Sequence, residues 1–158
     1  MSDFRRVVVT GLGIVSPFGV GVSTFWNSLL EGKSGISTIE NISLDGHTVH
    51  IAGEVKDFKP EEYLDAKEAK RMDRYTHFAM VAADEAIADS GIDEANIDPY
   101  RIGVIVSSAA GGFKTTEKSH TAMIEKGPTK CSPFTVPMLI VDMASGHVSI
   151  KHGYKGVN

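Results

Sequence analysis

The stretch DAKEAKRMDRYTHFAMVAADEAIADSG, residues 65–91, predicts one long helix over about 67–90. Asp65 with Glu68 three residues later matches a capping box, and Gly91 supplies a C-terminal stop. Between these ends, apolar residues recur at spacings of three and four and form one stripe. The stripe comprises Met72, Tyr75, Ala79, Ala82 and Ala86, widened by Phe78 and Ile87. Its many alanines predict close packing against another helix or a sheet.

Two runs rich in β-branched residues flank this helix along the chain. Residues 5–10 and 102–106 contain consecutive rather than alternating apolar residues, which predicts strands buried on both faces. The order of strand, long helix and strand is typical of a parallel βαβ unit. The sequence therefore predicts an α/β fold with a parallel-rich sheet and covering helices.

The remaining elements are less regular. Residues 23–32 predict a short helix that ends at Gly32, and residues 51–55 predict an edge strand. Residues 113–133 are polar and predict irregular structure. A last helix is expected from Pro137 to about Ile150, stopped by Gly153. Its predicted apolar face comprises Leu139, Met143, Gly146 and Ile150.

The composition fits one globular domain. The chain has 158 residues, of which 42% are hydrophobic and 23% charged, with a net charge of -4. Mild acidity argues against broad nucleic-acid binding, and no apolar run approaches the roughly 20 residues that span a bilayer. The one cysteine, Cys131, excludes an intramolecular disulfide and a Cys-based zinc site, so a reducing cytoplasm is expected.

One glycine motif raises the possibility of a nucleotide site. Residues 11–16, Gly-Leu-Gly-Ile-Val-Ser, follow the first predicted strand as a dinucleotide-binding fingerprint would. The match is poor because Ser16 replaces the third glycine and Pro17 falls where the phosphate-binding helix should continue. A tight turn packed in the core explains these glycines better, and a nucleotide-binding domain stays as an alternative.

The histidines and the cysteine predict structural roles, with no metal site and no cofactor. His47 and His50 are three residues apart, but no helix or cysteine supports a metal site there. His77 and His147 lie in predicted helices, where histidine is usually a hydrogen-bonded structural residue. Cys131 lacks the surroundings of a recognised nucleophile.

A cluster of basic residues opens the long helix. Lys67, Lys70, Arg71 and Arg74 lie at its positive end, while Asp84, Glu85 and Asp89 lie at its negative end. Each placement costs a few tenths of a kcal/mol on an exposed helix. The cluster indicates either a solvated helix end or a docking patch for an anionic partner.

Together these segments resemble the type II β-ketoacyl-acyl-carrier-protein synthases, specifically the elongating synthase II branch. The resemblance covers essentially all 158 residues in order. It rests on Arg6-Val7-Val8-Val9-Thr10-Gly11-Leu12-Gly13, Ser16-Pro17, Gly19, Trp26, Leu29-Leu30, Gly35-Ile36, Arg71-Met72-Asp73, Ala88-Asp89-Ser90-Gly91, Arg101-Ile102-Gly103, Gly111-Gly112, Gly127-Pro128, Ser132-Pro133-Phe134, Pro137, Met143, Gly146-His147 and Gly153.

The resemblance implies a thiolase-like fold, of which residues 1–158 would form most of the first half, in an enzyme that is a homodimer. It also implies decarboxylative Claisen condensation of acyl and malonyl carrier-protein thioesters, with a cysteine nucleophile and two histidines. The family's nucleophile lies several residues beyond the position matching Asn158, and the histidines lie further on. No catalytic residue is therefore assigned here, and the chain alone is expected to be inactive. The alternative is a truncated, non-catalytic homologue that binds acyl carrier protein or a full-length synthase.

Two sites follow from the resemblance. The basic surface that docks the acidic acyl carrier protein matches Lys67, Lys70 and Arg71, with Lys130 on a neighbouring loop. Thr129 replaces a second basic residue usual beside Lys130, which weakens the expected docking. Ala110 and Thr135 match the end of the acyl pocket at the dimer interface, where smaller side chains would leave room for longer chains.

Overall fold

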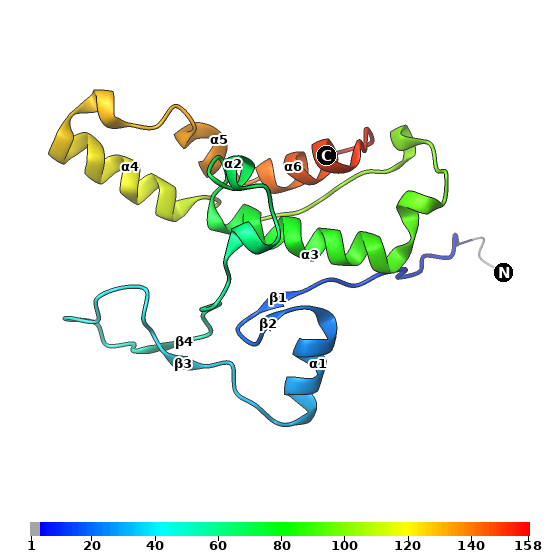
Figure 1. The fold of residues 1–158 in the computed structure, drawn as a ribbon, viewed down its shortest axis with the longest axis horizontal. Coiled ribbons are helices and arrows are strands. Elements are labelled where there is room, and N and C mark those ends of the chain that lie inside the picture. Colours follow the sequence, from blue (N-terminus) through cyan, green and yellow to red (C-terminus); the bar gives the residue numbers. More distant parts are fainter. Residues whose placement is uncertain (1–3) are drawn as a thin grey trace.

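A computed structural model describes residues 4–158, with two helices, α3 and α6, side by side at its centre (Figure 1). The helices of this part of the chain are α1 (Val22–Leu30), α2 (Ala66–Ala69), α3 (Arg74–Ser90), α4 (Phe113–Lys126), α5 (Thr135–Leu139) and α6 (Met143–His152). The strands form two antiparallel pairs, β1 (Val15–Ser16) with β2 (Gly19–Val20), and β3 (Ser37–Thr38) with β4 (Ile51–Ala52). Short 3₁₀ turns are η1 (Pro60–Glu62), η2 (Ile92–Glu94), η3 (Pro99–Arg101) and η4 (Pro128–Lys130).

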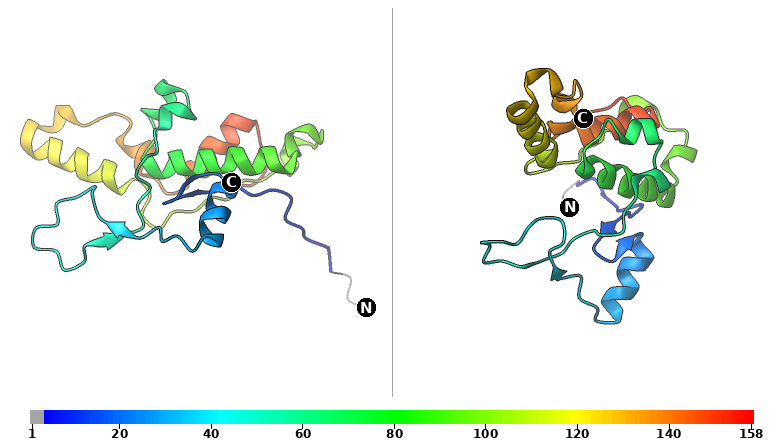
Figure 2. Two further views of the ribbon diagram at one scale, coloured as in Figure 1. Left: turned by 60° about the horizontal axis from the view of Figure 1, so that its bottom comes forward. Right: turned by 60° about the vertical axis from the view of Figure 1, so that its left-hand side comes forward.

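The buried core lies between α3 and α6. Met72, Met80 and Val148 are buried together, and Leu64 and Val104 pack against them. Figure 2 shows that α1 and the β3–β4 pair stand away from this centre. The best-packed part of the molecule is therefore the α3–α6 pair. The turn between α2 and α3 lies at one end of this pair.

The predicted long helix is two helices. Asp65 caps α2 as expected, because its side chain accepts hydrogen bonds from the amides of Lys67 and Glu68. The chain then turns, and Asp73 caps α3 by accepting from the Tyr75 amide. Asp73 is buried and also accepts from the Thr115 amide and hydroxyl, at 3.2 and 2.5 Å. These partners explain the break, since an uninterrupted helix would not place Asp73 in the cap position.

The predicted stripe is only partly right. Its first residue, Met72, is buried in the core as expected, but Tyr75, Phe78 and Ala79 are only half-buried. Near the start of α3 the buried positions are Thr76, His77, Met80 and Val81. Further along, Ala82 and Ala86 face the extended segment 4–14, whose two glycines lie against the helix backbone. A Cβ on Gly13 would overlap the Ala82 carbonyl oxygen and come within 2.8 Å of the Ala86 nitrogen. The close packing expected from the alanines is thus confirmed.

The two predicted buried strands are extended, but no strand is assigned to them in the described part of the chain. Val7 and Ile105 are 93% and 85% exposed, so the expected burial on both faces is wrong. Residues 102–104 make two backbone hydrogen bonds to the chain end, from Gly156 to the Ile102 carbonyl and from Val104 to the Val157 carbonyl, both 2.9 Å. A strand is buried only when lateral neighbours and covering layers are present, and this chain supplies few of them.

The C-terminal half differs from expectation in two places. Residues 113–126 form α4, where irregular structure was expected. The expected helix 137–150 is α5 followed by α6, and the latter buries Ala144, Ser145 and Val148 while Ile150 is exposed. Ser145 explains this choice of face, since its hydroxyl exchanges hydrogen bonds with the Val106 backbone at 2.9 and 3.0 Å.

Several turn signals are confirmed. Gly91 and Gly153 adopt left-handed conformations, with φ of 63° and 71°, at the ends of α3 and α6. Helix α1 is confirmed with Gly32 just beyond it, and β4 is confirmed as a shorter strand than expected. Among residues 4–158, no helix combines the length and apolar character needed to cross a bilayer.

Candidate functional site

The predicted docking residues Lys67, Lys70 and Arg71 lie on α2 and the turn that follows it, and all three are exposed. Contacts with buried residues and backbone hydrogen bonds fix the backbone of these three residues. Ala69 is buried, and its carbonyl oxygen lies 2.8 Å from Nε2 of the buried His77. The Arg71 amide donates to the Glu68 carbonyl at 2.9 Å. The three exposed cationic side chains therefore belong to a turn whose backbone is fixed by hydrogen bonds and by burial of Ala69.

Lys130, the fourth predicted docking residue, is exposed at the end of η4. The structure brings its segment to the α2–α3 turn through Phe134, because the Arg71 guanidinium lies over the Phe134 ring, 5.1 Å from its centroid. Sequence reasoning assigned no role to Phe134. No local pattern could have done so, since the contact joins residues far apart in the chain.

The four docking residues make no ion pair within residues 4–158, as is also true of other exposed basic residues such as Arg101, Lys114 and Lys118. Within residues 4–158, ion pairs to carboxylates engage Lys33, Lys56, Lys59 and Lys151, together with His152, and none engages the docking set. Lys67, Lys70, Arg71 and Lys130 hence keep their charges available to an external anion. We call these four residues the basic surface.

Arg74 does not belong to the basic surface. Its Nη2 donates to the Val55 carbonyl at 2.5 Å. Its guanidinium lies over Phe78 and Phe58, at 4.9 and 5.6 Å from the ring centroids. Arg74 is a structural residue that ties residues 55–58 to α3.

The helix-dipole argument for docking fails in the structure. Lys67 lies in the last turn of α2, which suits a cation, and Arg74 is engaged internally. At the other end of α3, Glu85 accepts from the amides of Ile14 and Val22 at 2.9 and 2.8 Å. Asp84 and Asp89 are bonded as well, to Lys151 and to the Leu12 amide. The charge placement therefore reflects bonds within the chain.

The two predicted pocket residues lie on segments that meet. Ala110 is exposed, and Thr135 is half-buried at the start of α5 with its Oγ1 2.9 Å from the Ser119 Oγ. The Gly112 amide donates to the Leu139 carbonyl at 3.2 Å, which joins the loop after Ala110 to α5. The assignment of Ala110 and Thr135 to an acyl pocket stays a prediction.

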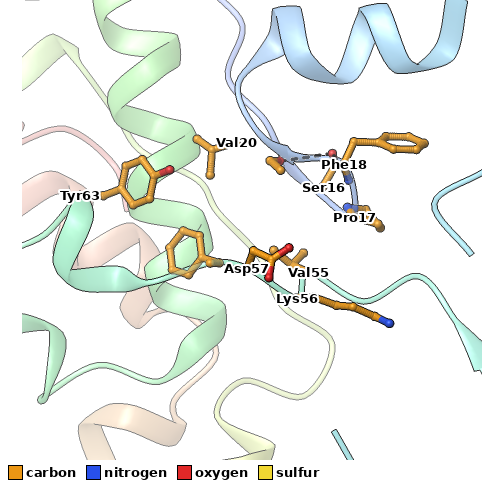
Figure 3. A pocket seen from close by; sticks show the side chains of 10 residues that line it. Ser16, Pro17, Phe18, Val20, Val55, Lys56, Asp57 and Tyr63 are labelled. Carbon is orange, nitrogen blue, oxygen red and sulfur yellow. Dashed lines mark hydrogen bonds between the residues drawn. The ribbon is translucent and has the colours of Figure 1, made fainter. Parts of the chain in front are cut away.

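The glycine motif does not form a phosphate cradle. Gly11 and Gly13 are packed against α3, and β1 and β2 form a tight hairpin beyond them. A small pocket of about 150 Å³ lies beside the hairpin, lined by residues 16–20, 55–58 and Tyr63 (Figure 3). Ligand pockets typically measure about 300–1,000 Å³. The nucleotide-binding alternative is therefore not supported by this site.

The side chains of Cys131, His77 and His152 make internal contacts. Cys131 donates from Sγ to the Ser119 carbonyl at 3.7 Å. His152 lies between Asp84 and Asp93, with each ring nitrogen 3.0 Å from a carboxylate oxygen. Hydrogen bonds from Tyr154 and His152 lower the pKa of Asp93. No group of three His, Cys, Asp or Glu residues in the described part of the chain could hold a metal ion.

Burial of His147 has a consequence for stability. Desolvation lowers its pKa, partly opposed by Glu68. The unfolded chain, with an ordinary histidine pKa near 6.5, therefore binds the proton more tightly than the folded chain does. Stability should be unaffected above about pH 6.5 and should fall as the pH decreases through the folded-state pKa.

We expect His147→Gln to flatten the decline in the urea midpoint between pH 7.5 and 5.5. Exposed His47→Gln is the matched control and should keep the wild-type slope. An unchanged slope in the His147 variant would show that another group is responsible.

Comparison with known proteins identifies the family to which this chain belongs. Residues 4–158 match the sequence profile described as "Beta-ketoacyl synthase, N-terminal domain". This chain belongs to the β-ketoacyl synthase family. It is 49% identical over 158 residues to 3-oxoacyl-[acyl-carrier-protein] synthase 2 of Staphylococcus aureus strain N315, covering 100% of this chain and 38% of that protein. The synthase 2 of Synechocystis is 46% identical over 156 residues, with 98% and 37% covered.

Solved structures show the fold. The ishigamide ketosynthase/chain length factor superposes with a TM-score of 0.85 at 24% identity, covering 97% of this chain and 38% of that chain. A type II PKS ketosynthase in complex with its acyl-carrier protein gives 0.76 at 24% identity, with 96% and 40% covered. The predicted α/β, thiolase-like fold is confirmed for this β-ketoacyl synthase chain, although the strands of residues 4–158 form two antiparallel pairs and not the expected parallel-rich sheet. The chain spans 37–38% of the length of the two synthase 2 relatives named above.

Proposed function

We propose that this chain acts as the N-terminal part of a β-ketoacyl-acyl-carrier-protein synthase of fatty acid biosynthesis, and that its basic surface docks the carrier. The observation that carries the proposal is the basic surface itself: four exposed cations, none paired with a carboxylate within residues 4–158, on segments joined by Arg71 and Phe134. The 49% identity to a synthase 2 over the whole chain supports it. We further propose a cytoplasmic enzyme that works as a homodimer.

The activity of the whole enzyme would be decarboxylative condensation of an acyl thioester with malonyl carrier protein. In that reaction this chain would bind and orient the carrier, so that its thioester meets a nucleophile supplied by residues matching positions beyond Asn158 in relatives. Electrostatic steering by a basic surface raises the rate of encounter with an acidic partner more than it tightens the complex. The 158 residues alone are expected to show no condensing activity.

The exposed area supports a role as part of a larger assembly. The chain exposes 11280 Å², whereas a folded monomer of 17.0 kDa is expected to expose about 7,700 Å². The excess includes apolar side chains of the extended segments, such as Val7, Val9 and Ile105. Apolar surface of this kind is normally covered by other parts of a protein or by a partner.

Reversing two charges of the basic surface tests the docking role. We expect Lys67→Glu with Arg71→Glu to weaken binding of acyl carrier protein about tenfold at low salt, because two attractive contacts become repulsive. The loss should shrink as salt rises, since exposed charges are screened. Titration of labelled carrier at two salt concentrations measures both effects.

The matched control is Arg101→Glu with Lys118→Glu, which changes the net charge equally at exposed positions outside the basic surface. This control should bind nearly as the wild type does. Equal weakening in both double variants would indicate a general charge effect and would refute a defined docking surface.

A further inference from the structure

We propose that Phe134 is a positioning residue of the basic surface: its ring supports the Arg71 guanidinium and fixes the α2–α3 turn against the segment that carries Lys130. This inference rests on the proposed carrier docking and adds to it a residue that bears no charge. The guanidinium carbon lies 5.1 Å from the Phe134 centroid, within the range in which a cation is attracted to the face of an aromatic ring.

The kind of contact matters for docking. If Arg71 were paired with a carboxylate of this chain, its N–H donors would already be occupied. Arg74 is an example of a guanidinium that is occupied internally, since it donates to the Val55 carbonyl. An aromatic ring attracts the charge and accepts no conventional hydrogen bond. The five N–H donors of the Arg71 guanidinium therefore stay available to a carboxylate of the partner.

Both sides of the contact are anchored through their backbones. Arg71 follows α2, and its amide donates to the Glu68 carbonyl. Phe134 is the N-cap residue of α5; its amide donates to the Ser132 hydroxyl at 3.2 Å, and its carbonyl accepts from Met138 at 3.0 Å. Phe134 is 38% exposed, so the residue lies at the surface. The side-chain contact thus joins two separately anchored segments.

The segment just before Phe134 carries Lys130. The Lys130 amide donates to the Gly127 carbonyl at 3.1 Å, and the next residue, Cys131, is bonded to Ser119 on α4. Lys130 is consequently held on the same anchored segment as Phe134. Without the ring, the long Arg71 side chain would sample more rotamers, and ordering it would count against binding.

Leucine at position 134 tests the role of the ring. We expect Phe134→Leu to weaken carrier binding about threefold, within the range for a cation over an exposed aromatic ring. Phe134→Tyr retains the ring and should bind within about twofold of wild type. In an Arg71→Gln background the Leu substitution should have no further effect, because the two residues act as one unit.

The possible results separate this inference from the proposed function. If wild-type protein binds no carrier, the docking proposal itself fails. If wild type binds and Phe134→Leu binds the carrier equally well, only the positioning role of Phe134 is overturned. The same holds if Phe134→Leu lowers the carrier affinity as much in the Arg71→Gln background as in the wild type.

A second readout needs no carrier. In the free protein, the NMR signal of the Arg71 Nε–H group should be displaced by the ring current of Phe134 and should move toward its random-coil position in Phe134→Leu. A signal that is identical in both proteins would overturn the contact directly.

Discussion

Gly13→Ala should destabilise the protein by about 2–3 kcal/mol, the largest effect of overpacking expected from a single methyl group here. The extended segment 4–14 crosses α3 with its backbone against the helix. A Cβ on Gly13 would overlap the Ala82 carbonyl oxygen and lie 2.8 Å from the Ala86 nitrogen, and neither backbone atom can move aside cheaply. Urea unfolding followed by circular dichroism measures the change.

Gly146→Ala is the matched control, because Gly146 lies inside α6 and a Cβ there would meet nothing within 4 Å. Alanine in a helix interior should stabilise the protein by about 0.5–1 kcal/mol. Opposite signs for the two substitutions are therefore expected. A Gly13 variant as stable as wild type would contradict the close approach of segment 4–14 to α3.

Glu85→Gln should cost about 1.5–3 kcal/mol, the usual range for charge-assisted hydrogen bonds and for donors left without partners. The carboxylate accepts from the Ile14 and Val22 amides, and so joins α3 both to the N-terminal segment and to the first residue of α1. Glutamine has one carbonyl oxygen, so its NH₂ group would face one of these amide donors. The same urea measurement applies.

Exposed Glu61→Gln changes the charge equally and should leave stability within about 0.5 kcal/mol of wild type. If Glu85→Gln were equally harmless, the carboxylate would not be the link between α1 and α3. The result also tests the helix-dipole argument, which predicts that Glu85 at the negative end of a helix is unfavourable.

Local signals in the sequence predicted the ends of elements well. Asp65, Gly91 and Gly153 act at the positions where their chemistry is useful, because capping depends on neighbouring backbone groups. The alanines of α3 also predicted a close approach, which Gly11 and Gly13 supply. These features need only a few residues of context.

Features that depend on distant partners could not be predicted. The break before α3 depends on Thr115, which completes the bonding of Asp73 from another helix. The strand predictions failed for a related reason, because burial requires neighbouring strands that residues 4–158 do not provide for Val7 or Ile105. Helix α4 could not be predicted either, because its sequence is polar and has no clear apolar stripe.

In the candidate site, too, some residues could be predicted from the sequence and others depend on contacts between distant segments. Lys67, Lys70, Arg71 and Lys130 came from resemblance to a family, and their exposure agrees with the role assigned to them. Phe134 became visible only through its contact with Arg71. Arg74, which the sequence placed in the same cluster, is excluded by its bonds to the interior.

The most direct test is the intact mass of the polypeptide that carries this sequence, purified from its native source. The proposed function, together with an exposed area far above that of a folded 17.0 kDa monomer, predicts a mass more than twice 17.0 kDa. A soluble native protein with a mass near 17.0 kDa would contradict a role as part of a condensing enzyme and would favour a non-catalytic protein that binds the carrier or a synthase.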